Sequence, residues 1–205
     1  AGKILGCGKD IRDYSTKALM NTVAFVFQDT YIFAESVYDN IAMHQNVTQE
    51  AVEYAAKAAR CHDFIQSLPE GYHTKLGDGG HKLSGGEAQR IAIARAILKN
   101  APIVVLDEAM AFTDAENELA LREGMAELLK GKTVLMIAHR LYSIQDADMI
   151  FVLENGRLKE SGTHKDLLQK HGLYAHLWDI QNETESWRMK GGAVYVSDNP
   201  AIHLP

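Results

Sequence analysis

Two short apolar runs separated by one helix length constrain the fold of this 205-residue chain more than any other feature. Ile103 to Leu106 and Thr133 to Ile137 are almost continuously apolar, and the residues from about Ala115 to Lys130 between them suit a helix that Asp114 can cap. Strands and helices that alternate in this way form a parallel sheet covered by helices. Val23 to Phe27 predicts a further buried strand. The fold class is therefore predicted to be α/β.

Two helices are predicted between the strand at 23–27 and the strand at 103–106. Thr48 can cap a helix that continues to about Ser67. A second helix is predicted from Glu87 to Lys99, where strong helix formers follow Ser84.

The C-terminal part of the chain predicts a hairpin and one more helix. Asn155-Gly156 is a hairpin turn between two short strands, and Thr163 with Asp166 resembles a capping box that opens a helix toward Trp178. Beyond about Gln181 no periodic pattern continues, so a tail is predicted there.

Composition excludes several classes of protein. A formal net charge of -6 and scattered Lys and Arg residues argue against a nucleic-acid partner. Cys7 and Cys61 lie far apart and predict neither a disulfide framework nor a zinc site, so a reducing compartment is expected. No apolar run approaches the roughly 20 residues that cross a bilayer.

Polar residues follow each predicted strand. Asp107 and Glu108 end one strand, His139 follows another, and Gln28 follows the first. The carboxyl edge of an open α/β sheet is where such folds bind ligands. Taken singly, the two acids could cap the next turn, and the His and Gln could be ordinary solvated residues. Together they favour a nucleotide site, with Asp107 for Mg²⁺ and Glu108 for the attacking water.

Ser84-Gly85-Gly86 lies where a helix is predicted to begin. Free N–H groups and the positive end of the helix dipole meet there, which makes an anion site, and the Ser84 hydroxyl adds a donor. A flexible loop with an ordinary helix cap is the alternative. No stretch has the phosphate-loop pattern of Gly, four residues, then Gly-Lys-Ser/Thr. Gly6-Cys7-Gly8-Lys9-Asp10 comes nearest, and is interpreted as a turn.

These motifs, in this order, resemble the ATP-binding cassette (ABC) transporter family over about Gly2 to Gln181. The resemblance implies a P-loop NTPase-like ABC ATPase core with a partial parallel sheet flanked by helices. The larger departure from the family pattern is that the Walker A loop is missing from this sequence. It further implies a nucleotide-binding domain over residues 1–182, with a helical subdomain at about 30–100 that carries the signature motif, and a tail over residues 183–205.

The resemblance also assigns site residues and cofactors. ATP and Mg²⁺ are the implied cofactors. The implied catalytic residues are Glu108, His139 (the switch histidine) and Gln28 (the Q-loop), and Asp107 and Gln28 are implied metal ligands. The implied nucleotide contacts are Leu83, Ser84, Gly85, Gly86, Gln89 and Asp114. One departure from the family pattern is the loop Ala111-Phe112-Thr113-Asp114, where the family usually has Ser-Ala-Leu-Asp.

The family resemblance implies an exporter-type ATPase whose partners are a second such domain, arranged head to tail, and transmembrane domains. The expected location is the cytoplasmic face of a membrane. Without Walker A, this chain alone is expected to be inactive and poorly stable, because loss of a central strand exposes two sheet edges. A truncated, non-hydrolytic cassette that contributes only its signature face is the alternative. The related chromosome-maintenance ATPases insert long coiled coils before the signature, and no sustained heptads occur here.

Overall fold

The structure is a computed structural model that describes residues 2–6, 8–107, 115–138 and 140–190. The chain divides into two compact units, residues 1–137 and residues 138–205.

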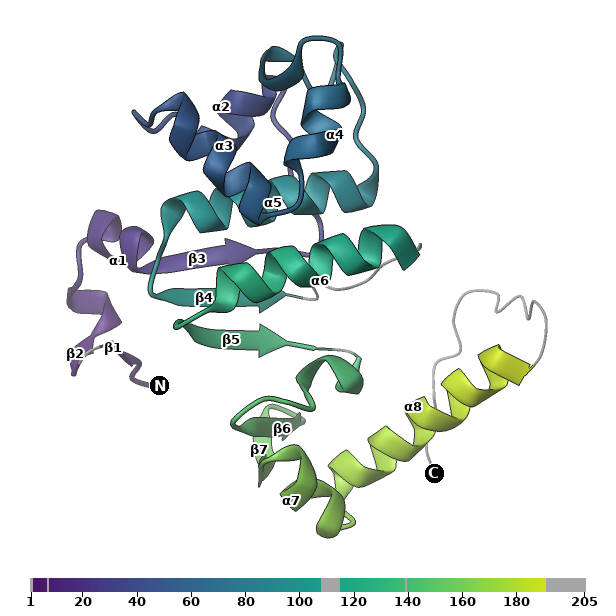
Figure 1. Ribbon diagram of the computed structural model, residues 1–205. Coiled ribbons are helices and arrows are strands. Elements are labelled where there is room, and N and C mark those ends of the chain that lie inside the picture. The colour runs from purple at the N-terminus through teal and green to yellow at the C-terminus, as the bar shows by residue number, and fades with distance from the viewer. Residues whose placement is uncertain (1, 7, 108–114, 139, 191–205) are drawn as a thin grey trace. The chain divides into compact units, whose positions relative to one another are not determined.

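The first unit is built on a parallel three-stranded sheet of order β3-β4-β5 (Figure 1). Its strands are β3 (Val23–Val26), β4 (Ile103–Asp107) and β5 (Thr133–Ile137). The register pairs Val26 with Leu106, and Asp107 with Ile137. All three predicted strands are therefore confirmed, and so is their parallel arrangement.

Helices form two layers on this sheet. α5 and α6 lie over the strands, and α2, α3 and α4 gather on the far side of α5 (Figure 1). The helices are α1 (Thr16–Thr22), α2 (Val37–Ala42), α3 (Gln49–Ala58), α4 (His62–Ser67), α5 (Gly85–Lys99) and α6 (Ala115–Leu129), with 3-10 turns η1 (Ile11–Asp13) and η2 (Gly71–His73). The strands β1 (Leu5–Gly6) and β2 (Lys9–Asp10) pair as a hairpin around the predicted turn.

The expected single helix from Thr48 to Ser67 is wrong, because α3 ends at Ala58 and a separate helix, α4, begins at His62. Thr48 does cap α3, through a hydrogen bond from the Ala51 amide. Arg60 then adopts a left-handed conformation with φ 56°. The amide of Arg60 bonds to the Lys57 carbonyl and that of Cys61 to the Ala56 carbonyl, which together form a Schellman motif. Glycine usually occupies the left-handed position at the end of a helix. Because arginine occupies it here, the sequence contains no signal for this helix break.

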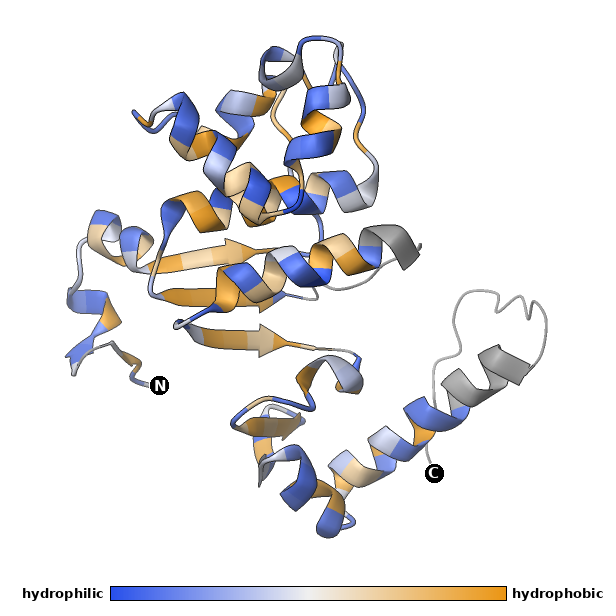
Figure 2. Cartoon of the chain, in the orientation of Figure 1, coloured by the Kyte–Doolittle hydropathy of each residue, from blue (hydrophilic) through white to orange (hydrophobic). Residues whose placement is uncertain are grey.

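One face of the sheet packs against the helices and the other does not. Val104 and Leu106 point into the helical core and are fully buried. On the opposite face, Phe25 is 43% exposed, Leu135 58% and Ile137 52%. Figure 2 shows the three strands as predominantly hydrophobic. The expectation of a sheet covered by helices therefore holds for one face of the described residues, and the other face is an apolar surface.

The buried side chain of Asn40 joins the segment before α2 to α5. Its amide nitrogen donates to the carbonyls of Phe33 (3.0 Å), Ser36 (3.0 Å) and Glu35 (3.4 Å). Its amide oxygen accepts hydrogen bonds from the Phe33 amide (2.9 Å) and from Arg95 Nη2 (2.7 Å). The Asn40 side chain thus helps to hold in place a segment without regular secondary structure.

The second unit begins with the short turn η3 (Leu141–Ile144), followed by an antiparallel hairpin of β6 (Ile150–Glu154) and β7 (Arg157–Gly162). Asn155 and Gly156 have φ values of 50° and 71°, as the predicted two-residue turn requires. This hairpin prediction is confirmed.

The last helix predicted from Thr163 is two helices, α7 (His164–Gln169) and α8 (Leu173–Lys190). The predicted capping box of Thr163 and Asp166 is present at the start of α7. The single helix is wrong because the Glu160 carboxylate accepts hydrogen bonds from the amides of Leu173 (2.7 Å) and Tyr174 (3.1 Å), which starts α8 afresh.

α8 also continues past Gln181, where a tail was predicted. Residues 183–190 contain good helix formers without an apolar period, so helix propensity rather than amphipathicity extends the helix. The expected domain limits, residues 1–182 with a helical part at about 30–100, stay a prediction. Within the described ranges, none of the helices combines the length and the apolar character that crossing a bilayer demands.

We expect Asn40→Ala to lower the free energy of unfolding by about 2–4 kcal/mol, because it removes the five hydrogen bonds of a buried side chain, including the one that the Phe33 amide donates to it. Urea denaturation measures this. Asn46→Ala is the control, since Asn46 is exposed, and should change stability by less than about 0.5 kcal/mol. Equal midpoints for both variants would contradict a stabilising role for the Asn40 contacts.

We expect the apolar sheet face to drive self-association. Sedimentation velocity should show an average mass that rises with protein concentration, and Leu135→Thr with Ile137→Thr should reduce the rise while keeping strand-forming residues. Leu119→Gln removes an exposed leucine from α6 and is the control. A chain that stays monomeric at all concentrations, or that responds equally to the control, would refute this expectation.

Candidate functional site

Two of the predicted site residues lie at the carboxyl edge of the sheet. Asp107 is the last residue of β4, and Gln28 follows the end of β3 by two residues. Because Val26 pairs with Leu106, both side chains leave the sheet at the same edge. Gln28 is exposed and Asp107 is half-buried, so both are accessible to a ligand. Glu108, Asp114 and His139, which the sequence also predicts for this site, lie outside the described residues.

Asp107 and Gln28 present one carboxylate and one amide oxygen. Among the residues that the structure describes, no group of three or more His, Cys, Asp or Glu side chains is placed to hold a metal ion. Mg²⁺ commonly takes one or two protein oxygens and completes its shell with water and substrate phosphates. The two oxygen-bearing side chains therefore fit Mg²⁺ bound together with a phosphate compound.

The N-terminus of α5 is held by a complete capping box. Ser84 Oγ accepts a hydrogen bond from the Glu87 amide (3.3 Å), and the Glu87 carboxylate accepts one from the Ser84 amide (2.8 Å). The hydroxyl proton of Ser84 remains available to donate. Ser84 and Gly85 are exposed, and a Cβ placed on Gly85 would meet no atom within 4 Å.

This end of α5 can therefore bind an anion through backbone N–H groups, one hydroxyl and the helix dipole. The Glu87 carboxylate opposes that field, because it brings a negative charge to the same helix end. The site is thus better suited to hydrogen bonding than to purely electrostatic attraction of an anion.

The other predicted contacts near Ser84 are less accessible. Leu83 packs against the hydrophobic core, and Gly86 is half-buried. Gln89 lies one turn further along α5 and is only 7% exposed. Ser84 and Gly85 are therefore the open part of this motif, while the assignments of Leu83, Gly86 and Gln89 stay predictions.

α5 brings its N-terminus to the same end of the unit as the carboxyl edge of the sheet. At the other end of the helix, Lys99 Nζ donates to the carbonyl of Val23, the first residue of β3 (2.7 Å). Since the C-terminus of α5 lies at the amino edge of β3, the helix runs antiparallel to the strands (Figure 1). Ser84 therefore lies toward the end of the unit that carries Gln28 and Asp107.

Arg95, which no sequence motif marks, connects α5 to the segment after Gln28. Its guanidinium group donates to the carbonyls of Tyr31 (2.7 Å) and Asn40, and to the Asn40 side chain, and lies over the Phe33 ring. Burial lowers the pKa of Arg95 to about 10, so it stays charged at neutral pH. The one signal in the sequence that could have indicated this role is a charged residue between two alanines, at positions 94 and 96.

Comparisons with known proteins show which proteins this chain is similar to. Residues 1–111 match the family described as ABC transporter. The chain is 48% identical over 183 residues to the putative multidrug export ATP-binding/permease protein YgaD of Bacillus subtilis (strain 168), and 46% identical over 183 residues to a putative multidrug export ATP-binding/permease protein of Staphylococcus aureus (strain N315). In both comparisons the match covers 89% of this chain and 32% of the relative.

A solved structure is similar as well. It is titled as a bacterial Atm1-family ABC exporter with ATP bound, and it superposes with a TM-score of 0.81 at 43% identity. The match covers 88% of this chain and 32% of the solved chain. The chain thus has the ABC ATPase fold and spans about a third of the length of the relatives that it matches.

Two substitutions at Ser84 test its role as a helix cap independently of any role in binding. Ser84→Ala removes the oxygen that accepts the Glu87 amide and should lower the free energy of unfolding by about 1 kcal/mol. Ser84→Asn retains a capping oxygen and should stay within about 0.5 kcal/mol of the wild type. Thermal unfolding followed by circular dichroism checks both values, and an unchanged midpoint for Ser84→Ala would show that the cap contributes nothing.

Proposed function

This chain belongs to the ABC transporter family, and we propose that it works as the ATP-binding domain of an exporter-like membrane transporter. The main support is the open N-terminus of α5, where Ser84 and Gly85 are exposed and no atom fills the space beside Gly85. The relatives named above carry the description ATP-binding/permease, and the similar solved exporter has ATP bound. The term multidrug export belongs to the descriptions of those relatives.

We propose that Ser84, Gly85 and Gly86 bind the ATP held by a second ABC domain, in a head-to-tail pair. Backbone N–H groups and the Ser84 hydroxyl suit the terminal phosphates of a nucleotide. The printed sequence contains no glycine-lysine phosphate loop of its own. Leu83, Gln89 and Asp114 would border that nucleotide.

At the carboxyl edge, Asp107 and Gln28 would hold Mg²⁺ with the phosphates, as their oxygen donors permit. Mg²⁺ neutralises charge that develops on the phosphates. Glu108 would orient and polarise the attacking water, and His139 would donate a hydrogen bond to the terminal phosphate. Arg95 would keep the segment after Gln28 at a constant position relative to α5, through its bonds to Tyr31 and Asn40.

The proposed partners are a second ABC domain and the transmembrane domains of the transporter. The proposed location is the cytoplasmic face of a membrane, where ATP is available. No nucleic-acid partner is proposed, since the net charge is -6.

A complementation assay tests the shared site. A complete ATP-binding domain from a relative is made with its own signature serine replaced, so that it holds ATP but cannot complete a site. We expect this chain alone to hydrolyse ATP at background rate, and the mixture to hydrolyse it well above that rate. Ser84→Ala and Ser84→Asn should both reduce the rate about tenfold or more, because each removes the hydroxyl donor.

Ser67→Ala is the control for that assay, because Ser67 is an exposed serine whose hydroxyl bonds to the Phe64 carbonyl. It should leave the rate of the mixture unchanged. Strong hydrolysis by this chain alone would contradict the division of the site between two chains. A mixture that stays at background rate would contradict the role of Ser84 in a partner's site.

A further inference from the structure

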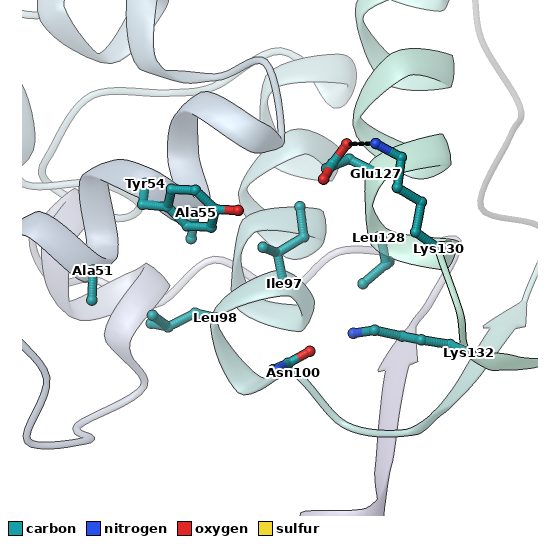
Figure 3. Close-up of a pocket in the computed structure, with 10 residues that line it drawn as sticks. All are labelled: Ala51, Tyr54, Ala55, Ile97, Leu98, Asn100, Glu127, Leu128, Lys130 and Lys132. Carbon is teal, nitrogen blue, oxygen red and sulfur yellow. Dashed lines mark hydrogen bonds and ion pairs between the residues drawn. The ribbon is translucent and has the colours of Figure 1, made fainter.

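A cavity of about 440 Å³ opens between α3, α5 and α6 in the first unit (Figure 3). Asn100 and Lys132 line it, and they come just before β4 and β5 respectively. The cavity therefore lies at the amino edge of the sheet, at the opposite end of the strands from Gln28 and Asp107. Its volume is within the range of pockets that bind small molecules.

The floor of the cavity is apolar. Ala51 and Ala55 of α3, Ile97 and Leu98 of α5 and Leu128 of α6 form it. The ring of Tyr54 stands beside this floor and is 67% exposed, which is unusual for an aromatic side chain of this size (Figure 3). A ring or a short hydrocarbon chain could lie between Tyr54 and the floor.

Among the residues that the structure describes, the polar part of the cavity has one positive charge without a counter-ion. Lys130 pairs with Glu127 at the rim. The Lys132 ammonium group reaches toward Asn100, and it has neither an ion-pair nor a hydrogen-bond partner in the part of the chain that the structure describes (Figure 3). Burial lowers the pKa of Lys132, which means that its charge has lost part of its solvation without gaining a counter-ion.

The lysines could serve only to complement the C-terminal ends of α5 and α6, which carry partial negative charge. That explanation accounts for positive charge at this place. It does not account for a concave apolar floor or for the exposed ring of Tyr54 beside it. A ligand with an anionic head and an apolar body accounts for all three.

We propose that this cavity binds a small amphipathic carboxylate. Its carboxylate would accept hydrogen bonds from the Lys132 ammonium group and the Asn100 side-chain amide. Its aromatic or aliphatic body would lie on Leu98 and beside Tyr54. The site is separate from the nucleotide site and does not depend on the function proposed above.

The test compares 4-phenylbutyrate with the neutral 4-phenylbutan-1-ol, by methyl NMR of the 205-residue chain. The protein is kept below the concentration at which it self-associates. We expect the acid to shift the methyl signals of Ile97 and Leu98, and Lys132→Gln to weaken its binding about tenfold or more, as loss of a charged hydrogen bond implies. The alcohol should bind more weakly, and Lys132→Gln should not change its affinity.

Two further variants complete the test. Tyr54→Ala removes the aromatic wall from an exposed position, and should weaken the binding of both compounds. Lys75→Gln removes an exposed lysine outside the cavity, and should leave the binding of both unchanged. The proposal is overturned if millimolar acid leaves Ile97 and Leu98 unshifted, if acid and alcohol bind equally, or if Lys132→Gln and Lys75→Gln behave alike.

Discussion

Burial of α5 between the sheet and the outer helices is the packing interaction on which the first unit depends. Four consecutive residues, from Ile91 to Ala94, are buried, so the helix is packed on opposite sides at once. Alanines at three buried positions let the neighbouring elements approach closely, and this makes the interior sensitive to small changes of volume. Because α2, α3, α6 and β3 all contact this helix, moving it would disturb both layers.

The same helix links the two ends of the unit. Its N-terminus carries the Ser84 cap, its middle carries Arg95, and its C-terminus is tied to β3 through Lys99. A 15-residue helix is about 22 Å long, so these groups act at distinct places on one rigid element. The open anion site and the segment after Gln28 are therefore both positioned by α5. The apolar cavity lies near the opposite end of the helix, beside Asn100.

Much of the local structure could be predicted because it depends on neighbours in sequence. The strands at 103–107 and 133–137 follow from apolar runs, the turn at Asn155-Gly156 from its residues, and the caps at Thr48, Ser84 and Thr163 from side chains that reach three residues ahead. The helix break at Arg60 could not be predicted, because an arginine there takes a conformation that glycine usually marks. The start of α8 depends on Glu160, which lies on another element.

The sequence by itself determined the α/β class, the parallel strands and the resemblance to the ABC family, and it predicted Gln28, Ser84 and Asp107 as site residues. These features are encoded in periodicity, caps and short motifs, which involve residues close together in the chain. Only the tertiary structure decided that Gln89 is buried while Ser84 is open, and that Arg95 holds the segment after Gln28. Within the described residues, it also decided that one sheet face is uncovered, and that Lys132 lines a cavity and has no counter-ion there. Those properties depend on which elements, distant in sequence, pack together. A side chain becomes buried, or gains or lacks a counter-charge, only after these elements have packed.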